Sequence, residues 1–289
     1  MSAVPPPFTA HFSTLAPDYD VVLCDVWGVV HNGIAAFTQA CDALMRFRAR
    51  GGAAVLITNA PRPSEAVARQ LDRLHIPREV YDGMVSSGDV TRNVILSRPG
   101  ESIYHLGPER DRSIFSGLKV RFAPLETADY VICSGIEDDD TEMPEDYRVR
   151  LQAMLARRLF MLCGNPDVVV ERGDRLVYCA GAIADLYATM GGEVFYAGKP
   201  YRPIYQQALA KAEAAQGRPV ALDRVLAIGD SVRTDLRGAH AFGVDFLFVT
   251  SGIHAEELGS RDAPDTTALR DVFAMAGEAP KAVMRRLVW

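Results

Sequence analysis

Short apolar runs alternate with amphipathic stretches along this chain. The run at 21–24 ends at Asp25, and the run at 53–57 ends at Thr58. Between them, residues 37–50 carry apolar positions among charged ones and stop at a glycine pair, which is typical of a helix with a glycine C-terminus. Short buried strands separated by helices predict a parallel sheet with right-handed crossovers.

The same alternation continues through the rest of the chain and falls into two blocks. We predict further strands at 102–106, 130–133, 160–164, 195–199, 225–229 and 245–249, and further helices at 64–74, 148–158, 204–214 and 235–242. The strands after residue 195 resume the first architecture. The sequence therefore predicts an α/β protein, with a doubly wound, Rossmann-like core at 1–85 and 196–289 and an inserted α/β cap domain at 86–195.

Composition narrows the function classes. The chain has 289 residues, 48% of them hydrophobic, and a formal net charge of −6, which argues against a nucleic-acid partner. Neither a signal peptide nor an apolar run of the ~20 residues that a membrane span needs is visible. Five cysteines without a C-x-x-C pair favour reduced, buried thiols. We expect a soluble cytoplasmic protein with no membrane partner.

Candidate catalytic residues follow the predicted strands. Asp25, Thr58, Lys199 and Asp230 lie at strand ends or just beyond them, and the carboxyl ends of parallel strands share one edge of a sheet. Two carboxylates, a hydroxyl and a cation suit phosphoryl transfer through an aspartyl-phosphate. In this hypothesis Asp25 is the nucleophile, and Asp25 and Asp230 bind Mg²⁺ through oxygen. Thr58 would donate to the phosphoryl oxygens, and Lys199 would neutralise charge.

Four segments together resemble a known family. D-V-W-G-V-V (25–30), I-T-N (57–59), G-K-P (198–200) and G-D-S-V-R-T-D (229–235) resemble, in order, the four signature motifs of the haloacid dehalogenase (HAD) superfamily. G-N-P-D (164–167), G-A (181–182) and T-S-G (250–252) look like its class IIA, NagD-like branch.

The resemblance implies roles for individual residues. Asp25 would be the nucleophile and a Mg²⁺ ligand, and the metal would also contact the Trp27 carbonyl and Asp230, with Asp235 coordinating or supporting the site. Thr58, Asn59 and Lys199 would bind the phosphate, which Trp27 and Gly28 would also border. The implied substrate is a small phosphorylated molecule and the implied enzyme a phosphatase. Relatives of this kind also form homodimers through the cap.

One position departs from the family pattern. Family phosphatases carry an acid–base Asp two residues after the nucleophile, where this chain has Trp27, and an indole N–H has no useful acidity. The acid–base group then comes from elsewhere, such as His31 or a cap side chain, or the enzyme is slow and needs good leaving groups. Alternatively, the chain is a phosphate-ligand binder or regulatory protein on this scaffold, or a related hydrolase such as a dehalogenase.

Other polar segments have plainer interpretations. Asn165 and Asp167 of the N-P-D segment are predicted to form a turn. The acidic stretch at 137–140 is predicted to be a surface loop. Asp235 is predicted to stand at the start of a helix, which is an alternative to a catalytic role.

Overall fold

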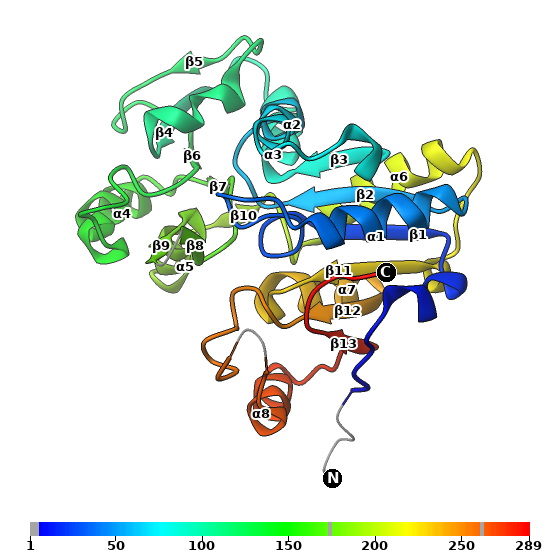
Figure 1. The fold of residues 1–289 in the computed structure, drawn as a ribbon. Helices are drawn as coiled ribbons and strands as arrows, with labels where there is room; N and C mark the ends of the chain where they lie inside the picture. The colour runs from blue at the N-terminus through cyan, green and yellow to red at the C-terminus, as the bar shows by residue number, and fades with distance from the viewer. Residues whose placement is uncertain (1–5, 173–174, 261–262) are drawn as a thin grey trace. The chain divides into compact units, whose positions relative to one another are not determined.

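The structure, a computed structural model, describes residues 6–172, 175–260 and 263–289. These form two compact units (Figure 1). The first, here called the core unit, comprises Met1–Thr58, Gln70–Val85 and Tyr205–Trp289, and the second, the cap unit, comprises Asn59–Arg69 and Ser86–Ile204. The domain boundaries predicted from the sequence remain a prediction. The two compact units divide the chain at other points and assign Asn59 and Lys199 to the cap unit.

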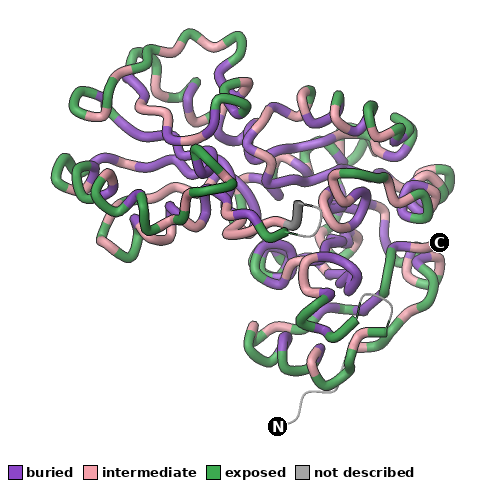
Figure 2. Tube along the Cα trace, turned by 60° about the vertical axis from the view of Figure 1, so that its left-hand side comes forward, coloured by how far each residue is buried: buried purple, intermediate pink, exposed green. Residues whose placement is uncertain are grey.

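A six-stranded sheet forms the centre of the core unit, in the order β13-β12-β11-β1-β2-β3. Its strands are β1 Val21–Asp25, β2 Ala53–Thr58, β3 Gly83–Ser86, β11 Val225–Gly229, β12 Asp245–Val249 and β13 Ala282–Met284. Strand β1 pairs in parallel with both β2 and β11. Every residue of β1, β2 and β11 is buried. Figure 2 colours the buried stretches of the whole chain purple. Strands covered on both faces read as continuous apolar runs, which is why the sequence located them.

The cap unit contains a second parallel sheet, in the order β10-β7-β6-β4-β5, and an antiparallel hairpin of β8 and β9. Its strands are β4 Ser102–Leu106, β5 Arg121–Phe122, β6 Tyr130–Cys133, β7 Met161–Cys163, β8 Val169–Arg172, β9 Arg175–Tyr178 and β10 Val194–Tyr196. One hydrophobic cluster joins the inner strands to the helices through Leu151, Met154, Ile183 and Tyr187. The cap unit therefore has a core of its own.

The α-helices are α1 Thr38–Ala49, α2 Ser64–Arg73, α3 Ser87–Leu96, α4 Arg148–Ala156, α5 Ala180–Thr189, α6 Arg202–Gln216, α7 Arg237–Phe242 and α8 Thr266–Ala276. Short 3₁₀ segments lie at Phe12–Thr14, Ala16–Asp18, Arg78–Val80, Glu109–Phe115, Pro144–Tyr147 and Leu222–Arg224. None of the helices in the described ranges is both long and apolar enough to cross a membrane. All five cysteines lie within the described ranges and are buried, as predicted.

The predicted fold class is confirmed, and one predicted strand and one predicted helix are corrected. The strand predicted at 195–199 as the return to the core architecture is β10, which pairs in parallel with β7 in the cap sheet. The helix predicted at 235–242 is α7 at Arg237–Phe242, preceded by a π-helical turn at Val232–Leu236. Ser231 caps this turn, because its hydroxyl accepts from the Thr234 N–H, so the helical backbone begins earlier than predicted. Asp235 therefore lies in the first turn of this helical segment, although not at its first residue.

Candidate active site

The candidate residues of the core unit lie at the carboxyl ends of its central strands. Asp25 is the last residue of β1 and is level with Ile57 of β2, one residue before Thr58. Asp230 directly follows β11, the neighbour of β1 on the other side. The chain leaves β1 toward β2 and leaves β11 toward β12, so the sheet order reverses between β1 and β11. This is the position at which doubly wound sheets bind ligands.

Three buried carboxylates meet at this point. Oxygens of Asp25, Asp230 and Asp235 lie within 4.8 Å of one another. The three residues are 8%, 5% and 3% exposed, so water screens their charges poorly. At this spacing each pair repels by about 3–4 kcal/mol at an effective dielectric constant of ~20. A bound cation would relieve such repulsion, and a compact set of carboxylate oxygens is the kind of ligand set that Mg²⁺ prefers.

Glycines leave the space that the Asp230 carboxylate occupies. A β-carbon on Gly28 would lie 2.0 Å from Asp230 Oδ2, and one on Gly252 would lie 1.9 Å from the same oxygen. The backbone N–H of Ile253 donates to Asp230 Oδ2 at 2.8 Å. The T-S-G segment after β12 therefore holds this carboxylate. Our sequence interpretation noted the segment without assigning it a role.

Asp235 is held by its own motif. Its Oδ2 accepts from the backbone N–H of Ser231 at 3.1 Å. A β-carbon on Gly229 would lie 2.3 Å from the Asp235 carboxyl carbon, so only glycine fits there. The fourth motif thus orders the Asp235 carboxylate through its own backbone.

The turn that follows β1 is closed by backbone hydrogen bonds. Gly28 N–H donates to His31 O at 2.8 Å, and Val30 N–H donates to Val26 O at 2.9 Å. Gly28 has a φ of 81°, a left-handed conformation that glycine adopts without strain. The structure thus places Gly28 beside Asp230 as a spacer and turn residue.

Trp27 and His31 pack against one another within this turn. Their rings meet edge to face, 5.0 Å between centroids, and the Trp27 ring also covers Gly33, where a β-carbon would come within 2.5 Å. His31 is 1% exposed, and its Nδ1 accepts from the Gly33 N–H at 2.8 Å. The imidazole therefore has a structural task in the turn, and the acid–base role considered for His31 remains a prediction.

The remaining motif residues belong to the cap unit. Lys199 and Asn59 are 4% and 3% exposed. The Asn59 side-chain amide contacts the Lys199 backbone and Asp167. Asn165 Oδ1 accepts from the Asp167 N–H at 3.1 Å, which confirms the predicted turn. These side-chain contacts of Asn59 were not foreseen from the sequence, and the phosphate-binding role predicted for Asn59 stays a prediction.

A polar network lies at the carboxyl edge of the cap sheet. His105 Nε2 lies 2.9 Å from Ser134 Oγ, and Ser134 also hydrogen bonds the Asp111 carboxyl. Burial raises the pKa of Asp111 to about 6, although the charges of Arg110 and Arg62 oppose the shift. Burial also lowers the pKa of His105 to about 4. At neutral pH the imidazole is neutral, and Ser134 donates to an ionised Asp111.

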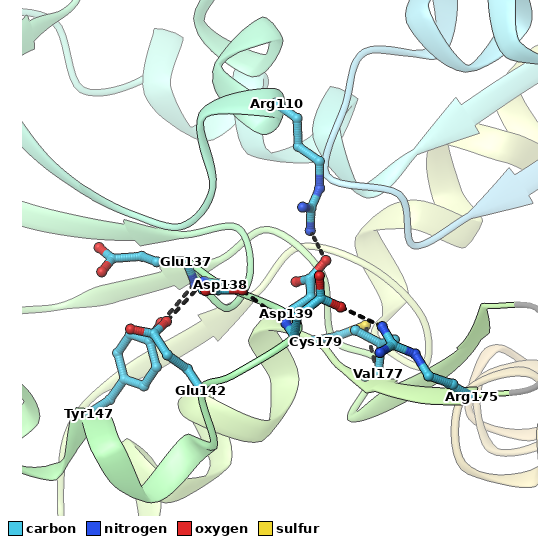
Figure 3. Close-up of polar contacts among 10 residues, drawn as sticks. Arg110, Glu137, Asp138, Asp139, Glu142, Tyr147, Arg175, Val177 and Cys179 are labelled. Atoms are coloured by element: carbon cyan, nitrogen blue, oxygen red, sulfur yellow. Dashed lines mark hydrogen bonds and ion pairs between the residues drawn. The ribbon is translucent and has the colours of Figure 1, made fainter.

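The acidic stretch at 137–140 forms a loop whose carboxylates have cap partners (Figure 3). Arg110 pairs with Asp139, and Arg175 pairs with Asp140. Glu142 accepts from the Tyr147 hydroxyl and from the Asp138 N–H. Hydrogen bonds and ion pairs within the loop account for these acids, in agreement with the predicted surface loop.

Comparison with known proteins adds the family. A family model described as haloacid dehalogenase-like hydrolase matches residues 22–121, and one described as HAD-hydrolase-like matches 196–274. A solved hydrolase of the haloacid dehalogenase-like family from Brucella suis 1330 is 43% identical, with a TM-score of 0.86 over 97% of this chain and 100% of that chain. The chain belongs to the haloacid dehalogenase superfamily.

Curated relatives place this HAD hydrolase in a branch. The 5′-nucleotidase YutF of Bacillus subtilis is 25% identical over 83% of this chain and 90% of its own. The ribonucleotide monophosphatase NagD of Escherichia coli K12 is 24% identical over 80% of this chain and 88% of its own. The predicted identity, a class IIA, NagD-like hydrolase, is confirmed.

Proposed function

We propose that this HAD hydrolase is a Mg²⁺-dependent phosphatase that acts on a small phosphate ester through an aspartyl-phosphate at Asp25. The supporting observation is the group of three buried carboxylates within 4.8 Å at the reversal point of the core sheet. Asp25, Asp230 and Asp235 would hold the metal, with the Trp27 carbonyl as a further ligand. Bound Mg²⁺ would neutralise these charges and those of the phosphate.

The reaction would take two displacements at phosphorus. In the first, an Asp25 oxygen forms a bond to phosphorus while the ester P–O bond breaks, and the leaving oxygen takes a proton from solvent or departs as an anion. In the second, a water oxygen forms a bond to phosphorus, the Asp25–phosphorus bond breaks, and the water loses its proton to solvent. Thr58 and Lys199 keep the phosphate-binding and charge-neutralising roles that the family resemblance gives them. Asn59, whose side-chain amide bonds to the Lys199 backbone and to Asp167, would reach the phosphate only through its backbone N–H.

Trp27 decides which substrates suit this chemistry. The Asp that stands at this position in family phosphatases would donate a proton to the leaving oxygen and remove one from water, and the loss of such a group costs about 10²–10⁴ in rate. The leaving group of an activated aryl phosphate departs as a stable phenolate, so it needs no proton from the enzyme. The second displacement still lacks its base. We therefore expect aryl phosphates to phosphorylate Asp25 faster than water releases the phosphate.

The relatives support the substrate class. YutF and NagD are a nucleotidase and a ribonucleotide monophosphatase, so both relatives hydrolyse phosphate monoesters. We propose that the substrate of this chain is likewise a small phosphorylated molecule, and we do not specify its leaving group. A homodimer, suggested by the family resemblance, stays a prediction.

The test is hydrolysis of 4-nitrophenyl phosphate against alkyl and sugar phosphates, each with Mg²⁺ and with chelator. We expect Mg²⁺-dependent aryl turnover with a rapid burst of about one nitrophenolate per chain before a slower steady rate. Asp25→Asn should abolish both phases, and Asp129→Asn, on a cap carboxylate, should leave both intact. Aryl turnover that is unchanged in Asp25→Asn would contradict the proposal.

Trp27→Asp is the sharper variant. If the missing base limits the second displacement, this variant should raise the steady rate and remove the burst. An unchanged rate in a folded Trp27→Asp protein would show that another residue already serves as the base.

Trp27 also favours a second candidate, a phosphate-ligand binder on the same scaffold. A protein that binds orthophosphate or a phosphate ester with Mg²⁺, yet turns over none of the esters, would support the binder and exclude the phosphatase.

A further inference from the structure

The Asn59 amide makes three hydrogen bonds to two partners. Oδ1 accepts from the Lys199 N–H at 2.7 Å, and Nδ2 donates to the Lys199 carbonyl at 3.1 Å. The second Nδ2 hydrogen goes to Asp167 Oδ1 at 2.9 Å. An amide offers two donors and one carbonyl oxygen, so these contacts occupy both donors and engage the acceptor.

Asp167 fixes which way the Asn59 amide points. An ionised carboxylate only accepts, so it requires the NH₂ end of the amide on its side. The opposite orientation would place two oxygens against one another. With the NH₂ end set by Asp167, the carbonyl end must face the Lys199 N–H. The carboxylate thus selects the one orientation in which Asn59 matches both backbone groups of Lys199.

Glycines bring these groups together. A β-carbon on Gly198 would lie 2.2 Å from Asn59 Oδ1, so no other residue before Lys199 lets the amide approach. A β-carbon on Gly181 would lie 2.3 Å from the Pro166 carbonyl oxygen, and the Gly181 N–H donates to the Asp167 carbonyl at 3.1 Å. Close backbone approach is the usual reason for glycine at such positions. The G-K-P, G-N-P-D and G-A segments therefore meet around a single amide.

We infer that Asn59 and Asp167 are positioning residues for Lys199. Through them, the N-P-D turn of the cap unit fixes the position of the Lys199 backbone, from which the side chain extends. The inference rests on the proposed function, in which Lys199 is the cation that stabilises the transferring phosphoryl group. A lysine ammonium stands at the end of a flexible four-carbon stem, so its position depends on a fixed backbone. A displacement of about 1 Å from catalytic geometry costs about 10²-fold in rate.

The alternative is that Asn59 and Asp167 only stabilise the cap unit. Both roles predict a less stable protein when either side chain is removed. Only the positioning role predicts an effect on catalysis that depends on the lysine. A double-mutant cycle with Lys199 therefore separates the two.

The experiment measures kcat and KM for 4-nitrophenyl phosphate in Asp167→Ala, Asp167→Asn, Lys199→Ala and the double variant Asp167→Ala/Lys199→Ala. We expect Asp167→Ala to lower kcat about 10- to 100-fold with little change in KM, because a transition-state contact is lost. Asp167→Asn should stay within about threefold of wild type, because the new amide oxygen still accepts from Asn59. In the Lys199→Ala background, Asp167→Ala should cost nothing further.

The matched control is Asp129→Ala. Asp129 accepts from the N–H and hydroxyl of Ser102 and pairs with Arg121 in the cap unit, so the variant also removes the contacts of a cap carboxylate. It should lower the urea midpoint and leave kcat unchanged. Equal rate losses from Asp167→Ala with and without Lys199, or a kcat loss in Asp129→Ala of the same size, would overturn the positioning role.

A failure of the proposed phosphatase function can be distinguished from a failure of the positioning role. If the wild type turns over no ester, the phosphatase proposal fails and the same variants are titrated with orthophosphate and Mg²⁺ by calorimetry. A roughly tenfold loss of affinity in Asp167→Ala that disappears in the Lys199→Ala background supports positioning. An unchanged affinity in Asp167→Ala, a loss that persists without Lys199, or a wild type that binds no orthophosphate overturns it.

Discussion

The two parallel sheets of this protein share a topological feature and use it differently. In the core sheet the strand order reverses between β1 and β11, and in the cap sheet it reverses between β4 and β6. At the first reversal three carboxylates crowd together. At the second, Ser134 links His105 to Asp111. Topology creates a place for polar side chains at each reversal, and the residue types decide the chemistry.

The two groups differ in the types of side chain that they bring together. In the cap network a neutral imidazole and a hydroxyl face one carboxylate, with Arg110 and Arg62 as nearby charges. The core group brings three carboxylates together, and backbone N–H groups donate to Asp230 and Asp235. The three carboxylates of the core group are therefore a better candidate for a cation site than the single carboxylate of the cap network. Each of the following predictions can break or sharpen that contrast.

The largest effect should follow from crowding the core carboxylates. Gly252→Ala puts a methyl group where Asp230 Oδ2 lies, so the carboxylate must move. We expect phosphatase kcat/KM to fall by about 10²-fold or more and stability to fall by about 1–3 kcal/mol. Gly83→Ala is the control, because its new β-carbon would meet only Lys211 at ordinary contact distance. Full activity in Gly252→Ala would show that Asp230 is not held as we describe.

Mg²⁺ should stabilise the folded protein through the core carboxylates and not through the cap network. Mg²⁺ at 100 times its Kd should raise the unfolding free energy of the wild type by about 2.7 kcal/mol. Asp230→Asn should abolish this gain, yet should be as stable as the wild type or more stable in chelator, because it removes one of three repelling charges. Asp111→Asn should keep the gain. Thermal unfolding of the wild type and both variants, with and without Mg²⁺, measures these differences. Loss of the Mg²⁺-dependent gain in Asp111→Asn would contradict the predicted difference between the core and the cap.

The cap network should show its own pH dependence. The pKa of Asp111 is raised to about 6 in the folded protein, so its contribution to stability is full below pH 4 and is lost as the pH rises through 6. The pKa of His105 is lowered to about 4, so stability is also lost as the pH falls from 6.5 toward 4, in wild type and variant alike. Between pH 4 and pH 7, the unfolding free energy of Asp111→Asn should therefore rise by about 2 kcal/mol relative to that of the wild type. Urea unfolding at several pH values tests this, and parallel curves would refute it.

The smallest effect should come from the acidic loop of the cap. Arg110 is 54% exposed at its side chain, although Asp139 is 5% exposed. Ion pairs with a largely solvated partner contribute up to about 1 kcal/mol. Arg110→Gln should lower the unfolding free energy by less than about 1 kcal/mol and leave aryl phosphate turnover unchanged. A larger loss would mean that this loop supports the His105–Ser134–Asp111 network.

Much of the fold was predictable because the information is local. The apolar runs that end at Asp25 and Asp230 are strands with every residue buried, and such strands are recognised without knowledge of their neighbours. Helix α5 and the hairpin of β8 and β9 were not predicted. Helix α5 is apolar through much of its length, so it lacks the amphipathic period that marks a helix at a surface. Asp235 was placed at a helix start, because the Ser231 cap that begins the π turn earlier was not recognised.

The sequence by itself determined the strand ends, the order of the four motifs and the departure at Trp27, because each depends on neighbouring residues. Only the tertiary structure decided the partners. Asn59 and Lys199 are 140 positions apart, and their contact depends on a turn at Asp167 and on Gly198, which leaves room for the amide. The need for glycine at position 252 likewise became clear only from its proximity to Asp230. Contacts across such separations follow from packing, and no local pattern along the chain specifies them.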